Sequence, residues 1–117
     1  MQYLLLIYGD ETREMSEDAQ QALLAEWFQY TEEIRGAGAA LGGDALQPTS
    51  TATTVTRGDD GGALVTDGPF AETREQLGGY YLIDVKDLDE AIEWARKCPG
   101  SKTGKIELRP IHQFDKA

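Results

Sequence analysis

The chain has 117 residues and a mass of 12.9 kDa, which predicts a single domain over residues 1–117. Its formal net charge is −10, so we expect no binding to nucleic acid or to anionic membranes, because like charges repel. The one cysteine, Cys98, excludes an internal disulfide and a metal site built from cysteines.

The first third of the chain predicts a strand, a long helix and a second strand. Residues 2–8 are rich in Leu, Ile and Tyr and predict the first strand. The helix begins near Ser16, a favourable N-cap residue, and ends at Gly36 and Gly38. Its apolar residues recur at spacings of three and four and form one stripe: Ala19, Leu23, Trp27, Tyr30 and Ile34. Residues 39–46 predict a second strand, which glycines loosen.

The apolar N-terminal segment, residues 1–8, bears on the location of the protein in the cell. It lacks the basic residues that open a secretory signal peptide, and a turn at residues 9–11 follows too soon for one. No other apolar run approaches the roughly 20 residues that span a bilayer. We therefore expect a cytoplasmic protein without a membrane-spanning segment.

The middle of the chain predicts a β-hairpin. Residues 51–57 are rich in β-branched side chains, residues 58–62 form a turn of Gly and Asp, and residues 63–66 return as the partner strand. Residues 67–70 break the chain again, and residues 72–76 predict one helical turn.

The last third predicts a strand, a helix and a strand. Residues 79–85 alternate as a strand. Asp87, followed three residues later by Glu90, is an Asp version of a capping box that begins the second helix. That helix ends at residues 98–100, and residues 105–114 predict the last strand.

The order of elements predicts the fold class. Without the hairpin, the order is βαββαβ, which predicts a ferredoxin-like α+β fold with an antiparallel sheet and both helices on one face. The strands at residues 2–8 and 79–85 are apolar on both of their faces, whereas the helices cover only one face. Since two apolar faces need two covers, we infer a homodimer that packs sheet against sheet.

The segment DGPFAET at residues 67–73, followed by GGYY at residues 78–81, resembles the signature of the DGPF family within the YCII-related proteins. The resemblance extends from residues 3–8 to residues 109–110. It implies a dimeric α+β barrel built from ferredoxin-like subunits, and a catalytic His–Asp pair in some members. It also implies an association with extracytoplasmic-function sigma factors, beside which DGPF members are often encoded. Five signature residues are assigned a structural role: Gly68, Pro69, Phe70, Gly78 and Gly79.

The sequence departs from the enzymatic pattern of the family. The catalytic histidine is expected on the first helix, yet no residue between Ser16 and Gly38 is histidine. The single histidine, His112, falls near the end of the last predicted strand, so Asp67 lacks the expected partner. The resemblance implies lyase or proton-transfer chemistry, but the dyad does not carry over, and whether the protein is an enzyme is left open.

Asp67 and Glu72 each have a structural and a functional interpretation. Asp67 either begins a turn, with Phe70 as an anchor in the core, or lies as a general base at the rim of a cleft between two subunits. Glu72 either pairs with Asp67 as two carboxylates for acid–base chemistry, or is a first-turn helix acid favoured by the helix dipole.

Four further residues are candidates for the site. Alternation places His112 on the apolar side of the last strand, where it is either a general base or a packing residue. Arg109, on the opposite side, clamps a substrate carboxylate or pairs with a surface acid. Tyr8 and Tyr81 line a cleft, or belong to the core or the dimer interface.

We expect neither a metal nor a cofactor. One histidine and one cysteine cannot form a structural zinc site, and the acidic residues do not follow the spacing of a calcium-binding loop. A phosphate-binding loop requires glycines that open a helix after a strand, and the pairs at residues 42–43 and 78–79 do not do so.

Two functions are compatible with these residues. The first is a homodimeric small-molecule-binding or enzyme-like domain that takes a small polar metabolite in a cleft near Asp67. The second is a non-catalytic accessory protein that binds a sigma factor or another regulator through its acidic surface. A dimeric scaffold without a ligand is the third interpretation.

Overall fold

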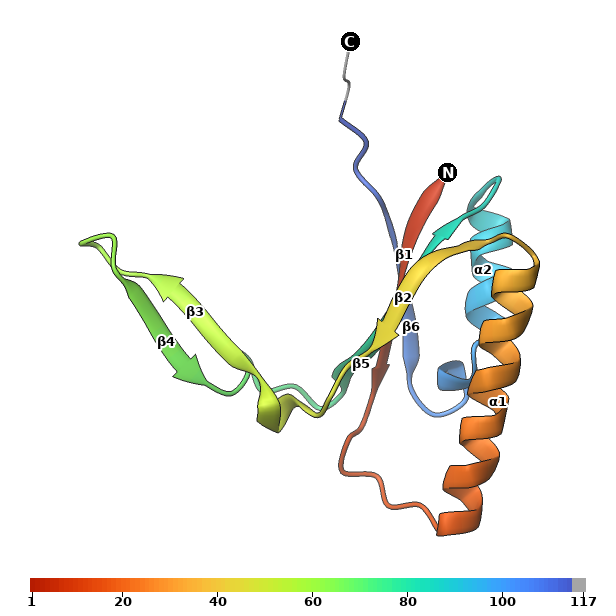
Figure 1. The fold of residues 1–117 in the computed structure, drawn as a ribbon, viewed down its shortest axis with the longest axis horizontal. Helices are drawn as coiled ribbons and strands as arrows, with labels where there is room; N and C mark the ends of the chain where they lie inside the picture. Colours follow the sequence, from red (N-terminus) through yellow and green to blue (C-terminus); the bar gives the residue numbers. More distant parts are fainter. Residues whose placement is uncertain (115–117) are drawn as a thin grey trace.

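The computed structural model describes residues 1–114 and contains a compact body and a projecting arm. The elements of the body are β1 (Gln2–Gly9), α1 (Glu17–Gly36), β2 (Ala40–Ala45), β5 (Gln76–Asp84), α2 (Leu88–Lys97), the 3₁₀ turn η2 (Pro99–Ser101) and β6 (Lys105–Pro110). The antiparallel sheet is ordered β2-β5-β1-β6, and both helices lie on one of its faces (Figure 1). The predicted ferredoxin-like α+β fold is therefore confirmed.

Between β2 and β5 the chain leaves the body and forms the arm, which we define as residues 46–75. It consists of the 3₁₀ turn η1 (Thr49–Thr51) and a hairpin of β3 (Thr53–Arg57) and β4 (Ala63–Asp67). Figure 1 shows the hairpin reaching away from the sheet on the side opposite the helices. The predicted hairpin is confirmed, and it forms a two-stranded sheet of its own.

Both helices begin at the predicted caps. The Ser16 hydroxyl accepts a hydrogen bond of 3.1 Å from the Ala19 amide. The Asp87 carboxylate accepts one of 2.9 Å from the Glu90 amide, and the Glu90 carboxylate accepts one of 3.1 Å from the Lys86 amide. These bonds satisfy amide groups that have no partner within the helix. Within residues 1–114, neither helix has both the length and the apolar composition needed to cross a membrane.

The core lies between the helices and the covered face of the sheet. Leu5 of β1, Ile34 of α1 and Ile83 of β5 are completely buried there. They lie at alternating strand positions or on the predicted helix stripe, as a period of two for strands and 3.6 for helices requires. The C-terminal half of the predicted stripe, at Tyr30 and Ile34, therefore reaches the core, whereas Ala19 at its start is exposed.

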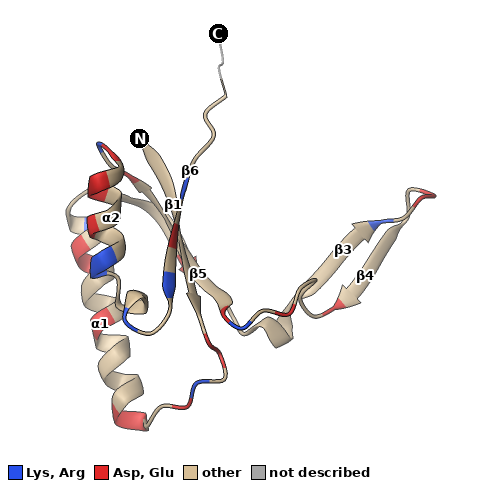
Figure 2. Cartoon of the chain, turned by 180° about the vertical axis from the view of Figure 1, so that it is seen from behind, with Lys and Arg blue, Asp and Glu red and all other residues tan. Residues whose placement is uncertain are grey.

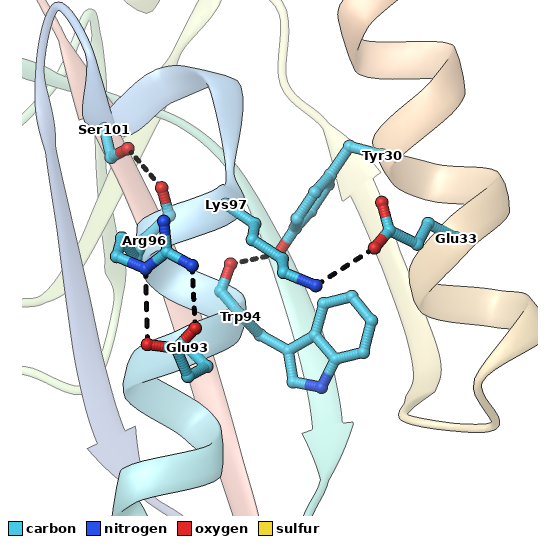
Figure 3. A network of polar contacts seen from close by, with 7 residues as sticks. All are labelled: Tyr30, Glu33, Glu93, Trp94, Arg96, Lys97 and Ser101. Atoms are coloured by element: carbon cyan, nitrogen blue, oxygen red, sulfur yellow. Dashed lines mark hydrogen bonds and ion pairs between the residues drawn. The ribbon is translucent and has the colours of Figure 1, made fainter.

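Polar contacts hold α2 against α1 (Figure 3). The Tyr30 hydroxyl donates a hydrogen bond of 2.7 Å to the Trp94 carbonyl, and burial raises the pKa of Tyr30 far above its usual value. The Lys97 ammonium lies 3.1 Å from a Glu33 carboxylate oxygen and 5.2 Å from the centre of the Trp94 ring. The buried tyrosine bond fixes the two helices more firmly than the exposed ion pair does, because solvent screens the latter.

Within residues 1–114, no element covers the second face of the sheet. Leu4 and Leu6 of β1 lie opposite Leu82 and Tyr80 of β5, and all four are half-buried. Arg109 of β6 lies opposite Leu4 and is exposed. The face is apolar at its centre, as predicted, and the homodimer that would cover it stays a prediction.

Three local predictions were wrong. Residues 72–76 form no helical turn, because Gln76 already pairs with Gly9 as the start of β5. Phe70 is 90% exposed rather than anchored in the core, because the arm carries it away from the body. The last strand ends at Pro110 rather than at residue 114, because its pairing with β1 ends there, with Pro110 opposite Tyr3.

The shorter last strand changes the setting of His112. This residue lies beyond β6 and is exposed, so it is not on the apolar side of a strand. Its ring lies 4.3 Å from the ring of Phe114, which is also exposed. The packing interpretation of His112, which depended on an apolar strand environment, therefore loses its basis, and a role as general base stays a prediction.

Candidate binding cleft

A cleft of about 620 Å³ opens between α1 and one end of the sheet. The end of β1, the end of β2 and the start of β5 form one wall, and one side of α1 forms the other. Its volume falls within the range of roughly 300–1,000 Å³ that is common for small-molecule sites.

The α1 wall is a stripe that lies beside the core stripe. Leu24, Phe28, Thr31 and Arg35 follow each other at spacings of four, three and four, which places them on one side of the helix. Leu24 and Phe28 are apolar, yet they are 54% and 68% exposed. The wall is therefore apolar along its N-terminal half and polar along its C-terminal half.

A pair of hydroxyl groups lies where α1 faces β5. The Thr31 and Tyr81 hydroxyl oxygens are 2.5 Å apart, and both residues are half-buried. The Tyr81 ring packs edge-on against the Tyr30 ring, with centroids 5.7 Å apart, which fixes its position. Because the pair uses only one of its two hydroxyl hydrogens, the other is able to donate to a ligand.

Gly43 of β2 makes room for this pair. A Cβ atom at this position would lie 2.4 Å from the Tyr80 carbonyl oxygen and 2.9 Å from the Tyr81 ring. Its φ of +156° also lies outside the range that side-chain-bearing residues favour. The close passage of β2 over Tyr81 therefore requires glycine.

The charged groups of the cleft differ in whether they already have partners. Asp10 accepts hydrogen bonds from the hydroxyl (2.6 Å) and the amide (2.8 Å) of Thr12. Both bonds lower the pKa of Asp10, and the bond from the hydroxyl has the larger effect. Glu11 accepts bonds from the amide (2.9 Å) and the hydroxyl (2.7 Å) of Thr49. Among residues 1–114, Arg35 has no ion-pair partner. The guanidinium of Arg35 is therefore the charged group best able to bind an anionic or carbonyl oxygen.

The cleft contains part of the set of residues predicted from the sequence. Tyr8 and Tyr81 line it, together with Gly78 and Gly79. The remaining candidates lie elsewhere and are exposed: Asp67 and Glu72 on the arm, Arg109 on the uncovered sheet face, and His112 beyond β6. This cleft is thus distinct from the one predicted between two subunits near Asp67, which stays a prediction.

Sequence reasoning missed the α1 wall. No role was assigned to Leu24, Phe28 or Arg35 from the sequence. A usable signal was present, since Leu24 and Phe28 are apolar residues four apart that fall off the core stripe. No group of three or more His, Cys, Asp or Glu side chains within residues 1–114 is arranged to hold a metal ion.

Known proteins resemble this chain in sequence and in fold. Residues 1–115 match the YCII-related domain family. An uncharacterised protein of Rhizobium meliloti (strain 1021) is 40% identical over 119 aligned positions, which cover 95% of this chain and 92% of the relative. A match at the level of the DGPF branch stays a prediction.

A solved structure has the same fold. It is the 5-chloro-2-hydroxyhydroquinone dehydrochlorinase of Burkholderia phenoliruptrix AC1100 in complex with 2,5-dihydroxybenzoquinone, with a TM-score of 0.57 and 12% sequence identity. The match covers 97% of this chain and 96% of that chain. At this level of identity, the likeness confirms the fold alone.

Proposed function

This chain belongs to the YCII-related family, and we propose that it is a homodimeric small-molecule-binding domain whose ligand occupies the cleft between α1 and the sheet. The proposed ligand is a small flat ring that carries hydroxyl, carbonyl or carboxylate oxygens. One observation carries the proposal: the Thr31–Tyr81 hydroxyl pair and Arg35 adjoin an apolar wall in one cleft.

The two halves of the α1 wall suit the two parts of such a ligand. The exposed side chains of Leu24 and Phe28 offer an apolar surface for the face of a ring. The guanidinium of Arg35 and the free hydroxyl hydrogen of the Thr31–Tyr81 pair donate to oxygens at its edge. The dehydrochlorinase, which shares the fold, was solved with a ring of this class, and this makes that ring a suitable probe.

The alternative function, an accessory protein for a sigma factor or another basic regulator, is supported by the net charge of −10. Figure 2 shows acidic residues on both helices, in the loop after β1 and at the tip of the arm. Charge that is spread in this way keeps a protein soluble, but it does not define a docking surface. The cleft therefore supports the binding proposal more strongly.

Isothermal titration calorimetry with 2,5-dihydroxybenzoquinone and benzoate as probes tests the proposed ligand class. We expect Arg35→Gln to weaken binding about tenfold or more, since it removes a charge-assisted hydrogen bond. Tyr81→Phe, which keeps the ring and removes the hydroxyl, is expected to weaken binding about three- to tenfold. Arg13→Gln is the matched control, because Arg13 is exposed and outside the cleft.

Two outcomes contradict the proposed site. Binding that survives both cleft variants but is lost in Asp67→Asn or Arg109→Gln would return the site to the residues predicted from sequence. Failure of both probes, together with a basic protein that co-purifies at fixed stoichiometry, would favour the accessory function.

A further inference from the structure

The arm is poorly covered by the rest of the described chain. All five residues of β4 and four of the five residues of β3 are exposed. An isolated two-stranded hairpin is marginally stable in water at best, and needs a third strand or another packing surface. The body does not supply that surface, because the hairpin stands away from it (Figure 1).

Several of the exposed side chains of the arm are large and apolar. Val55 and Val65 lie directly opposite each other on one face of the hairpin and are 62% and 63% exposed. Leu64, on the other face, is 59% exposed, and Phe70 is 90% exposed. Apolar residues gathered on an uncovered hairpin mark an interaction surface, since water would otherwise surround them.

The accessible surface of the chain is large for its mass. It measures 8686 Å², whereas a compact monomer of this mass exposes about 6,300 Å². The radius of gyration is 16.8 Å, against about 13.4 Å for a compact domain of this length. The excess of about 2,400 Å² is well above the roughly 800 Å² that each partner buries in a standard interface.

The position of the arm indicates what covers it. The arm projects on the same side of the molecule as the uncovered sheet face (Figure 1). Two sheets that pack face to face lie about 10 Å apart, and a strand of five residues is about 17 Å long. A second copy seated on the sheet face would therefore stand beside the arm, within its reach.

We infer that the arm of each subunit clasps a second copy of this chain, so that Val55, Val65 and Phe70 become buried in the same interface as the uncovered sheet face. This inference rests on the homodimer of the proposed function and adds the arm to its interface. The signature segment at residues 67–73 then serves assembly.

The root of the arm also links this interface to the cleft. Glu11, which lines the cleft, accepts two hydrogen bonds from Thr49 of the arm. The Glu11 amide donates a bond of 3.0 Å to the side-chain oxygen of Gln76, where the arm rejoins the sheet. A partner that holds the arm thereby also holds one edge of the cleft.

Sedimentation velocity of the full chain across a range of concentrations tests the clasp. The wild type is expected to sediment as a dimer. The arm variant combines Val55→Thr, Val65→Thr and Phe70→Ser, and its threonines favour strands as the valines do. It is expected to raise the dimer dissociation constant at least about tenfold, because both arms of the dimer lose apolar contacts. Leu6→Lys, on the sheet face, is expected to be monomeric. Ile92→Thr is the matched control on α2, where it is 46% exposed.

The outcomes separate the clasp from the dimer. If the arm variant dimerises like the wild type, the clasp is wrong, while the sheet-to-sheet dimer stands. If the wild type is a monomer at all concentrations, both are wrong. Hydrogen exchange gives a second readout without mutation: amides of residues 53–57 and 63–67 are expected to exchange slowly above the dissociation constant and fast on dilution. Equally fast exchange in both states would overturn the clasp.

Discussion

Strands β1 and β4 both contain apolar residues at successive positions, yet their environments are opposite. In β1, Tyr3 is 3% exposed and Leu5 is completely buried, because α1 and α2 pack on that face. In β4, Leu64 and Val65 are 59% and 63% exposed, because no other element within residues 1–114 packs on the hairpin. A strand pattern therefore specifies pairing, whereas burial depends on which element lies above the strand.

Truncation of the two leucines gives the largest contrast between body and arm. Leu5→Ala is expected to lower the free energy of unfolding by about 2–5 kcal/mol, because it opens a cavity in the core. Leu64→Ala is expected to change it by no more than about 0.5 kcal/mol in dilute protein, where the arm is free. Urea denaturation measures both, and equal losses would contradict the contrast.

The dependence of stability on alkaline pH tests whether the Cys98 side chain is buried in the body. Burial raises the pKa of the Cys98 thiol to about 11, from an ordinary value of 9.0. Since the folded state favours the neutral thiol, its contribution is fully present below pH 9 and is lost as the pH rises through 11. We expect a loss of about 2 kcal/mol over this window, measured by urea denaturation. Cys98→Ala is expected to flatten this dependence between pH 9 and 10, below the ordinary pKa of Tyr30, whose burial adds a loss of the same sign at higher pH. An unchanged slope between pH 9 and 10 would contradict the assignment.

Two neighbouring glycines of β2, Gly43 and Gly42, differ in the space around them and allow a comparison of a packed position with an open one. Gly43→Ala is expected to cost about 1–3 kcal/mol, because its Cβ would overlap the Tyr80 carbonyl and the Tyr81 ring. Gly42→Ala is the matched control, since a Cβ there meets nothing within 4 Å. Thermal unfolding measures the difference, and similar melting temperatures for the two variants would show that β2 does not approach Tyr81 this closely.

The smallest expected effect concerns the start of α1, which forms one wall of the cleft. Ser16→Ala removes the cap bond to the Ala19 amide and is expected to cost about 1 kcal/mol. Ser16→Asp keeps an acceptor there and is expected to retain stability. Denaturation of the three proteins measures both effects, and a loss in Ser16→Asp as large as in Ser16→Ala would argue against capping.

Most of the fold is predictable from the sequence, because it depends on local signals. The caps at Ser16 and Asp87, and the stripe that includes Tyr30 and Ile34, follow from residue type and period. The hairpin likewise follows from its β-branched strands and glycine-rich turn. The structure departs from the predictions where a segment has no partner, as at Phe70 and His112.

The cleft is less predictable, because it joins residues that are distant in the chain. Thr31 and Tyr81 are 50 positions apart and meet only because β5 lies under α1. The signature at residues 67–73 identified the family, but its chemistry suits a turn and an active site equally well. Its position on an arm outside the cleft follows from the three-dimensional path of the chain alone.

A titration of the ¹⁵N-labelled full chain with 2,5-dihydroxybenzoquinone, followed by ¹H–¹⁵N correlation spectra, compares the cleft with the signature segment directly. We predict shifts at the amides of Thr31, Arg35 and Tyr81, with the amides of residues 63–73 unchanged. Shifts confined to residues 67–73 or to Arg109 would contradict the assignment of the site to the cleft.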